Sequence, residues 1–338
     1  MAATKTLRVG MSNSNRIHRD IIVIGASAGA TPVLTRLAAL LPSDFPPVLL
    51  VRHIGSHQSV LPELLSGAGR MRVRHAVAGD AIEPGNLLIA PPDQHMLVAD
   101  GVIRLTRGAK ENLARPAIDP LFRSAAACFG PRVIGVVLSG RLDDGTAGLQ
   151  AIKACGGLAI VQDPADALEP SMPRSALRYV AVDWTTPGEQ LAATLQRAIG
   201  EPIRSAPAVP AAVRHENDLS MDTGNDMSGL DAIGRPSKVS CPACGGVLWH
   251  IDDSAPPRYR CHTGHAYTLD ALDQTQARHT DDELWRALRA LHERQRVIDM
   301  LVDLHGEASR EGALRIAEQS RVATAILHLR SLMDAGVP

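Results

Sequence analysis

The stretch IIVIGASAG, Ile21–Gly29, decides the fold that we expect for this chain. Its first four residues are continuously apolar, which is typical of a strand covered on both faces of a parallel sheet. The strand runs directly into Gly-Ala-Ser-Ala-Gly, in which the flanking glycines allow a tight turn from strand to helix. A helix-like segment, Pro32–Leu41, follows. The stretch therefore predicts a strand–turn–helix unit that holds the Ser27 hydroxyl clear of the sheet.

The same alternation continues to about Gly200. Further apolar runs of strand length are Val48–Val51, Leu87–Ala90, Val133–Leu138 and Leu158–Val161. Helix-like segments lie between several of them, including Ala117–Phe129 and Gly145–Cys155. This order predicts an α/β fold with a doubly wound, mostly parallel sheet and right-handed crossovers. A hairpin is expected around Gly101.

The composition excludes several classes of protein. Of 338 residues 45% are apolar, as in a globular chain of two or three domains. The formal net charge of −1 provides no basic field for nucleic acid or an anionic membrane. The first twenty residues lack an apolar stretch of signal-peptide length, and no segment approaches the roughly 18 apolar residues of a membrane span. We therefore expect a cytoplasmic protein without nucleic-acid binding or membrane insertion.

Five segments are predicted along the chain. They are an N-terminal extension (1–20), the α/β domain (21–200), a flexible linker rich in Pro and polar residues (201–240), a Cys/His-rich module (241–268) and a helical tail (280–334). The tail is expected to start at the capping box Thr280–Glu283 and to form a helical hairpin or coiled-coil-like element. Whether the tail covers a core or serves for docking or dimerisation is left open.

Two functional interpretations of the turn after the first strand compete. In a nucleophile elbow, G-x-S-x-G presents a reactive serine. In a dinucleotide-binding loop, a Gly-rich turn cradles phosphate, and Arg52 closes the second strand where an NADP-binding residue could lie. However, Ser27 stands where G-x-G-x-x-G requires glycine. The alternative to an enzyme is thus a non-catalytic or nucleotide-binding regulatory module with the same fold.

Two further residues favour the elbow. His53 follows the second strand, and Asp144 follows the strand Val133–Leu138. Because the carboxyl ends of parallel strands meet at one edge of a sheet, Ser27, His53 and Asp144 are placed to converge. In this arrangement the serine attacks, the histidine removes its proton, and the aspartate orients the imidazole.

Alternatives exist for two of these positions. His57, His75 and His95 compete with His53 for the role of base. Asp143 is not excluded by spacing, and an Asp before Gly145 ordinarily serves as a helix N-cap.

Residues 21–180 resemble the catalytic domain of chemotaxis protein-glutamate methylesterases. The resemblance rests on six segments in the family's order: IGASAGA, VRHIGSH, LLIAPPDQHM, RPAIDPLFRSAA, LSGRLDDGTAG and VQDPADALEPSMP. It implies that Ser27, His53 and Asp144 form the catalytic triad and that His95 is a second active-site histidine. It also implies an acyl-serine intermediate without a catalytic cofactor. The implied partner is a methylated chemoreceptor-type protein carrying γ-glutamyl methyl esters, with glutamine deamidation as a related activity.

The chain departs from the family in three respects. Ala28, Gly29 and Ala30 replace the usual Thr-Gly-Gly after the nucleophile, and Arg141 replaces a Met beside the oxyanion site. We expect the chemistry to survive, because backbone N–H groups such as that of Ala28 stabilise an oxyanion. Family members commonly carry an N-terminal phospho-receiver domain, for which twenty residues are too few. A separate regulator is therefore expected in its place.

The Cys/His-rich module has the spacing of a metal site. Cys241 and Cys244 form C-x2-C, and Cys261 and His265 follow at a distance typical of structural zinc. His265 is a better fourth ligand than its alternative His262, because the Gly264 turn can bring it back to the ion. With four protein ligands no coordination position stays open, so the Zn²⁺ is expected to be structural and separable from catalysis.

Overall fold

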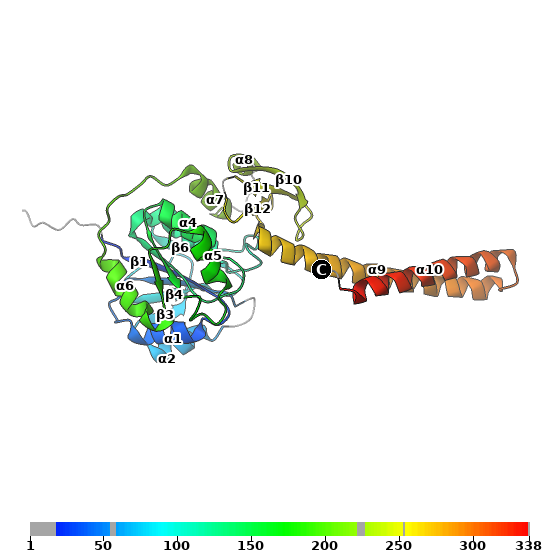
Figure 1. Cartoon of the computed structure of the whole chain (residues 1–338), viewed down its shortest axis with the longest axis horizontal. Coiled ribbons are helices and arrows are strands. Elements are labelled where there is room, and N and C mark those ends of the chain that lie inside the picture. The colour runs from blue at the N-terminus through cyan, green and yellow to red at the C-terminus, as the bar shows by residue number, and fades with distance from the viewer. Residues whose placement is uncertain (1–17, 55–58, 222–226, 253, 337–338) are drawn as a thin grey trace, which may run out of the picture.

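The computed structural model describes residues 18–54, 59–221, 227–252 and 254–336. It consists of an α/β body, a small antiparallel sheet beside it, and a long helical hairpin that projects away from both (Figure 1). We call residues 234–268 the metal-binding module, after the metal site predicted for this segment. None of the helices in these residues is long and apolar enough to cross a membrane.

The body is built on a seven-stranded parallel sheet in the order β3-β4-β2-β1-β7-β8-β9. Its strands are β1 (Ile21–Ala26), β2 (Val48–Arg52), β3 (Arg72–His75), β4 (Asn86–Ile89), β7 (Val133–Val137), β8 (Leu158–Gln162) and β9 (Trp184–Thr186). The strand β1 lies between β2 and β7 and is buried along its whole length. The predicted doubly wound α/β fold is thereby confirmed.

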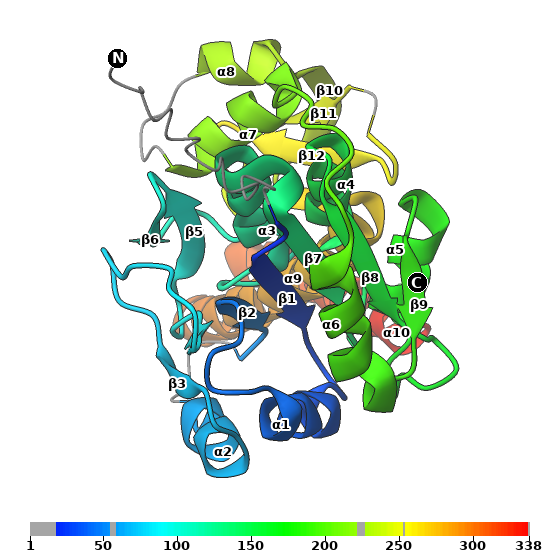
Figure 2. The ribbon, with the colours of Figure 1, turned by 90° about the vertical axis from the view of Figure 1, so that its left-hand side faces the viewer.

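Helices cover both faces of this sheet (Figure 2). Ile22 and Ile24 belong to the core formed with α1 (Thr31–Leu40), α2 (Leu61–Ala68) and α6 (Leu191–Gly200). Ile21 and Val23 point to the opposite face, where the core includes α3 (Ile118–Phe129), α4 (Thr146–Ala154) and α5 (Ser171–Tyr179). Successive residues of β1 therefore serve two cores, which is why the run carries no polar residue. Short 3₁₀ turns lie at Gly130–Arg132 and Gly188–Gln190.

The expected hairpin is present as β5 (His95–Ala99) and β6 (Val102–Thr106). Asp100 and Gly101 form its turn with φ values of 53° and 76°. Two consecutive positive φ angles match the twist of antiparallel strands, as in the common two-residue hairpin turn.

The segment 201–240 differs from the predicted flexible linker. It contains α7 (Ala211–Met221) and α8 (Met227–Asp231), and its last residues form β10 (Gly234–Ser240). The remaining strands of the metal-binding module are β11 (Val247–Ile251), β12 (Arg258–Cys261) and β13 (Ala266–Thr268). Few apolar residues anchor these elements: Leu219, Leu230 and Ile233 pack with Trp249 and Ile251. The polar composition misled the prediction because α7 buries Glu216 in ion pairs rather than an apolar stripe.

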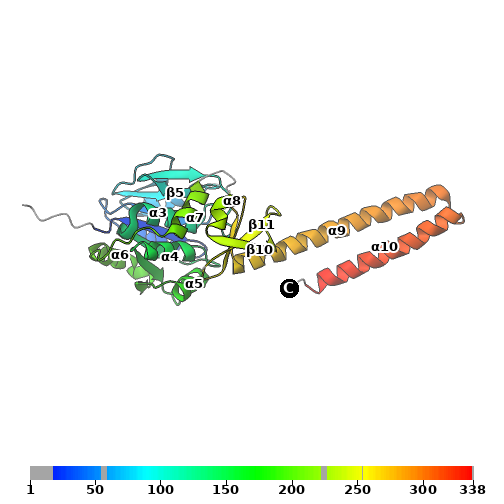
Figure 3. The same cartoon turned by 90° about the horizontal axis from the view of Figure 1, so that it is seen from above.

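The helical tail is longer than predicted. It consists of α9 (Leu269–His305) and the antiparallel α10 (Arg310–Asp334), as seen in Figure 3. The expected start at Thr280 is wrong, since Thr280–Glu283 lies inside α9. Thr268 is the N-cap instead, and its hydroxyl oxygen accepts the Ala271 N–H at 3.3 Å. The first turn of α9 thus grows directly out of the metal-binding module.

Candidate active site

The turn after β1 places Ser27 at the carboxyl edge of the sheet. The Ser27 N–H donates to the carbonyl of Ser139 at 3.0 Å, which ties the turn to the end of β7. Gly29 has a φ of +80°, and a Cβ there would lie 2.6 Å from Ser139 Oγ. Because only glycine fits this turn, the Gly-Ala-Ser-Ala-Gly pattern is a structural requirement of the elbow.

His53 joins Ser27 to Asp144. His53 Nδ1 lies 3.1 Å from Ser27 Oγ, and His53 Nε2 lies 2.8 Å from Asp144 Oδ2. An ionised carboxylate can only accept a hydrogen bond, so Nε2 carries the hydrogen and the Nδ1 lone pair faces the serine hydroxyl. The three residues predicted from strand ends are thus brought together in one hydrogen-bonded series. A phosphate-binding loop would not require a histidine at Ser27, so this contact favours the elbow.

Asp144 is held by the N-terminus of α3. Its carboxylate accepts the N–H groups of Ile118 at 2.7 Å and Asp119 at 3.2 Å, and the Nδ2 of Asn112 at 3.0 Å. Burial alone would raise the pKa of Asp144, but the hydrogen bond and charge of His53, with these donors, lower it below its usual value. Burial and the charge of Asp144 raise the pKa of the neighbouring Asp119 to about 8. Of this carboxyl pair, Asp144 is the member that faces the imidazole.

Asp143, the alternative to Asp144, points elsewhere. Its Oδ1 accepts the hydroxyl of Thr268 at 2.8 Å, from the first turn of the helical tail. Burial raises the pKa of Asp143 to about 6. The structure brings Asp144, and not Asp143, against His53.

His95 does not face Ser27. It is buried, its Nε2–H donates to the Ala109 carbonyl at 2.9 Å, and its Nδ1 accepts the Ala117 N–H at 3.2 Å. Burial lowers the pKa of His95. Both ring nitrogens are thus engaged by backbone just before α3, and the side chain lines a separate cavity between the body and the metal-binding module. His95 is not among the residues that line the Ser27 pocket, and its place in the substrate or oxyanion vicinity stays a prediction.

The other competing histidines are also accounted for. His75 lies on the edge strand β3, and His57 lies outside the described residues. Among the histidines that the structure describes, the one hydrogen-bonded to Ser27 is His53.

Ser27 opens into a pocket of about 390 Å³. Its lining includes Ser27, His53, Asp93, Lys110, Asn112, Leu113, Arg115, Arg141, Leu142 and Asp144. Four non-glycine residues of this lining have positive φ angles, namely Asp93, Asn112, Leu113 and Leu142. Such strained backbone concentrates at functional sites, where the surrounding structure enforces it.

Arg141 lies at the rim of this pocket. Its side chain is 74% exposed, and one guanidinium nitrogen lies 2.9 Å from Glu169 Oε1. Ala28 lies in the elbow directly after Ser27, and within the described residues no carbonyl accepts its N–H. The elbow thus offers the Ala28 N–H as a donor directly after the serine, and the rim carries the Arg141 guanidinium, which is paired with Glu169.

Asn112 is the site residue that sequence reasoning missed. It is buried, contacts Asp144 and lies in a loop without regular secondary structure. A lone Asn in a loop is ordinarily a turn residue, so the sequence carries no signal of this role beyond its position three residues before Arg115.

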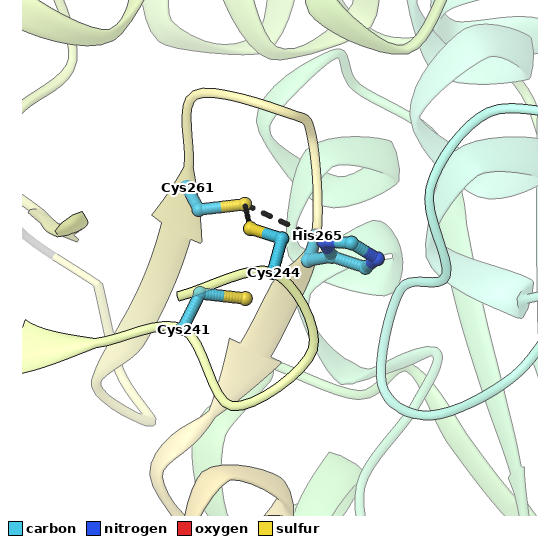
Figure 4. A group of neighbouring side chains, drawn as sticks. All are labelled: Cys241, Cys244, Cys261 and His265. Atoms are coloured by element: carbon cyan, nitrogen blue, oxygen red, sulfur yellow. Dashed lines mark hydrogen bonds between the residues drawn. The ribbon is translucent and has the colours of Figure 1, made fainter. Parts of the chain in front are cut away.

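A second cluster lies in the metal-binding module. One ligand atom from each of Cys241, Cys244, Cys261 and His265 lies within 4.8 Å of the others, as Figure 4 shows. The turn at Gly264, with a φ of +95°, returns the chain so that His265 faces the thiols. His262 packs against Gly246 instead and does not join the cluster. Three thiols and one imidazole from two turns are a donor set of the kind that binds a divalent metal such as zinc.

Comparison with known proteins bears on the body alone. The family model described as CheB methylesterase matches residues 22–195. A protein-glutamate methylesterase/protein-glutamine glutaminase of Anaeromyxobacter dehalogenans is 37% identical over 179 residues, which are 52% of this chain and 52% of that protein. A relative from Leptospira interrogans, whose name carries the same two activities, is 36% identical over 52% of this chain and 93% of its own length.

A solved structure agrees with these matches. The crystal structure of the Thermotoga maritima CheB methylesterase catalytic domain is similar with a TM-score of 0.51 and 29% identity, over 54% of this chain and 99% of that one. The chain spans about half the length of the Anaeromyxobacter relatives that it matches. The matched region of the family model ends before α7 and the metal-binding module.

Proposed function

This chain belongs to the CheB methylesterase family, and on that premise we propose that it is a protein-glutamate methylesterase acting through Ser27, His53 and Asp144. Its proposed substrates are γ-glutamyl methyl esters of a chemoreceptor-type signalling protein, with deamidation of glutamine as a related activity. The observation that carries the proposal is the hydrogen-bonded series from the Ser27 hydroxyl to the buried Asp144 carboxylate.

The reaction follows from this geometry. Ser27 Oγ attacks the ester carbonyl while His53 Nδ1 takes its proton, and the resulting imidazolium is stabilised by Asp144. The bond to methoxide then breaks, and His53 returns the proton to give methanol and an acyl-serine. Water deprotonated by His53 attacks this ester and releases the glutamate and the free serine. An amide substrate would lose ammonia at the first step in the same way.

The oxyanion of both tetrahedral intermediates requires donors near Ser27. The N–H of Ala28 directly follows the nucleophile and supports this role, which a backbone group supplies whatever its side chain. Arg141 stands where the family usually has Met, and its exposed guanidinium, paired with Glu169, places a long polar side chain at the rim. We therefore assign Arg141 to substrate selection rather than to the chemical step.

We further propose that Cys241, Cys244, Cys261 and His265 bind one structural Zn²⁺. The donor set fits this ion, and four protein ligands leave no position for water or substrate. Without an ion, the three thiols and the imidazole would have only hydrogen bonds to one another and to Thr263 and Tyr267, whereas the metal would fold the two turns against each other. Reduced thiols and a receptor substrate both agree with a cytoplasmic location.

Methanol release from methylated receptor fragments tests the enzymatic proposal. The full-length protein should release methanol, and the Ser27→Ala variant should not. Turnover by the variant close to that of the wild type would remove Ser27 from the mechanism.

A further inference from the structure

The metal-binding module contacts the loop beside the active site. The N–H of Ala266 donates to the Lys110 carbonyl at 3.3 Å, and the N–H of Asn112 donates to the Ala266 carbonyl at 2.8 Å. Glu111 and Ala266 accordingly pair as a parallel bridge. The loop thus lies on β13 as a short additional strand, which contradicts the expectation that the module is connected to the body by a flexible linker alone.

Asn112 reaches from this edge to the active site. Its Oδ1 accepts the Thr268 N–H at 3.2 Å, while its Nδ2 donates to Asp144 Oδ1 at 3.0 Å and to Asp119 Oδ2 at 2.9 Å. The residue is 7% exposed and has a φ of 48°, a conformation that Asn tolerates better than most residues. One buried amide therefore links β13 to the carboxylate that contacts His53.

The module also contacts Asp143, the residue next to Asp144. The Thr268 hydroxyl donates to Asp143 Oδ1 at 2.8 Å while it caps α9. The turn that carries Asp143 and Asp144 is therefore held by the module through two separate hydrogen bonds, one direct and one through Asn112.

Buried ion pairs fix the module in this place. Glu111 of the loop lies 2.9 Å from Arg123 of α3 and 2.8 Å from Arg260 of β12. Glu216 of α7 pairs with Arg258 of β12 at 2.8 Å and with Arg123 at 3.5 Å. These pairs make the docked orientation specific, because a shifted module would leave one of these charges buried without its partner.

Two residues of the ligand cluster flank the turn that leads into β13, the strand that makes these contacts. Cys261 is the last residue of β12, and His265 directly precedes β13. An ion bound to both would fix the turn between the strands, and with it the backbone of Ala266 and Thr268.

We propose that the metal-binding module is a structural part of the active site: Asn112, held by β13, is a positioning residue for Asp144, and metal binding orients Asn112. This inference rests on the function proposed above for Ser27, His53 and Asp144. The module thus couples metal occupancy to the geometry of the triad.

The test uses the full-length, zinc-loaded protein and two readouts. The first is the rate at which a small fluorophosphonate labels Ser27, which needs the triad but no receptor. The second is the downfield proton NMR signal of His53 Nε2–H, which reports its hydrogen bond to Asp144. Asn112→Ala should slow labelling by about 10- to 100-fold, the effect of one hydrogen bond to a charged group, and should shift or remove the signal.

Two further variants separate positioning from folding. Asn112→Asp keeps an acceptor for the Thr268 N–H but places a third carboxyl group against Asp144 and Asp119 in place of the donor, so it should slow labelling at least as much as Asn112→Ala. Gln150→Ala is the matched control, since Gln150 Nε2 donates to the Ala255 carbonyl at 2.6 Å in the same interface but does not touch the triad. It should label at the wild-type rate and keep the signal.

Metal removal completes the test. Chelation should slow labelling of the wild type and weaken the His53 signal, and added Zn²⁺ should restore both. In Asn112→Ala the further loss on chelation should be smaller, because coupled changes are not additive.

The inference is overturned if Asn112→Ala and the metal-free protein match Gln150→Ala in both readouts. A zinc-loaded wild type that the probe does not label would instead contradict the proposed function. The His53 signal would then still decide whether Asn112 and the metal orient the triad.

Discussion

The α/β body and the metal-binding module assemble their functional side chains in opposite ways. In the body, Ser27, His53 and Asp144 follow three adjacent strands, β1, β2 and β7, and a sheet buried on both faces holds them. In the module, the four ligands come from two turns between Cys241 and His265, around a small core. The strands that carry the first site are therefore positioned by burial of apolar surface, whereas the second site would be held together by the proposed ion. The two should respond differently to substitution.

The largest expected effect is that of Ser27→Ala. Turnover should fall by on the order of 10⁶, because loss of the nucleophile removes nearly all of a triad's contribution. The melting temperature should stay close to that of the wild type, since the side chain lies in a turn outside the core. Methanol release and a thermal melt measure the two quantities. An unchanged turnover would contradict the assignment of Ser27 as the nucleophile.

Among the histidines, His53→Ala should lower turnover almost as much as Ser27→Ala does. His95→Ala should have a smaller effect on turnover. Among the described histidines, His53 is the one that hydrogen-bonds to the serine, whereas loss of His95 leaves the Ala117 N–H and the Ala109 carbonyl buried without a partner. We expect the His95 variant to lose about 1–3 kcal/mol of stability for each such group. Turnover and urea unfolding of both variants distinguish these roles. A more severe catalytic loss in His95→Ala would reassign the base.

Asp144→Asn should lower turnover by about 10⁴, because an amide favours the wrong tautomer of the imidazole. Steady-state kinetics of Asp144→Asn and Asp143→Asn compare two adjacent residues of which one contacts His53. Equal losses of turnover in the two variants would contradict the role of Asp144 as the triad aspartate.

The module should lose its ion when Cys241 and Cys244 are both replaced by Ser. Elemental analysis of protein purified without chelator should give one zinc per wild-type chain and none for this variant. Hydrogen exchange should then rise in β10–β13 while the central strands of the body stay protected, since the module's fold depends on metal binding. Cys128→Ser is the control, because Cys128 lies in α3 outside the cluster. Zinc retained by the double variant would exclude the assigned ligands.

The smallest expected effect is a pH dependence of stability at the contact between the two regions. The pKa of Asp143 is raised to about 6, above its usual value in an unfolded chain, so its protonated form is favoured in the folded state. The stabilisation is fully present below about pH 4 and is lost as the pH rises through 6, by at most about 3 kcal/mol.

Asp143→Asn should therefore abolish this loss and be more stable than the wild type at pH 7, while the two should match near pH 3.5. Urea unfolding at both pH values measures the difference. If the difference in unfolding free energy between wild type and variant were the same at both pH values, Asp143 would not be buried against Thr268.

Much of the fold and of both clusters could be predicted from local patterns. The apolar runs of β1, β2, β7 and β8 mark strands because a parallel sheet covered on two faces tolerates no polar residue. Strand ends place Ser27, His53 and Asp144 at one edge, since all parallel strands end there. The metal-ligand spacing is likewise local, because two short turns suffice to gather the cluster.

Only the tertiary structure decided how the two regions meet. Glu216 and Arg260 look like surface charges in the sequence, but they are buried because they pair across the interface. His95 looks like a second active-site histidine, yet backbone groups before α3 engage both its nitrogens. Asn112 carries no periodic or motif signal, and its partners Asp144 and Thr268 lie far along the chain. Polar contacts at long sequence separation leave no pattern in the residues themselves, whereas apolar burial repeats with the period of the element that makes it.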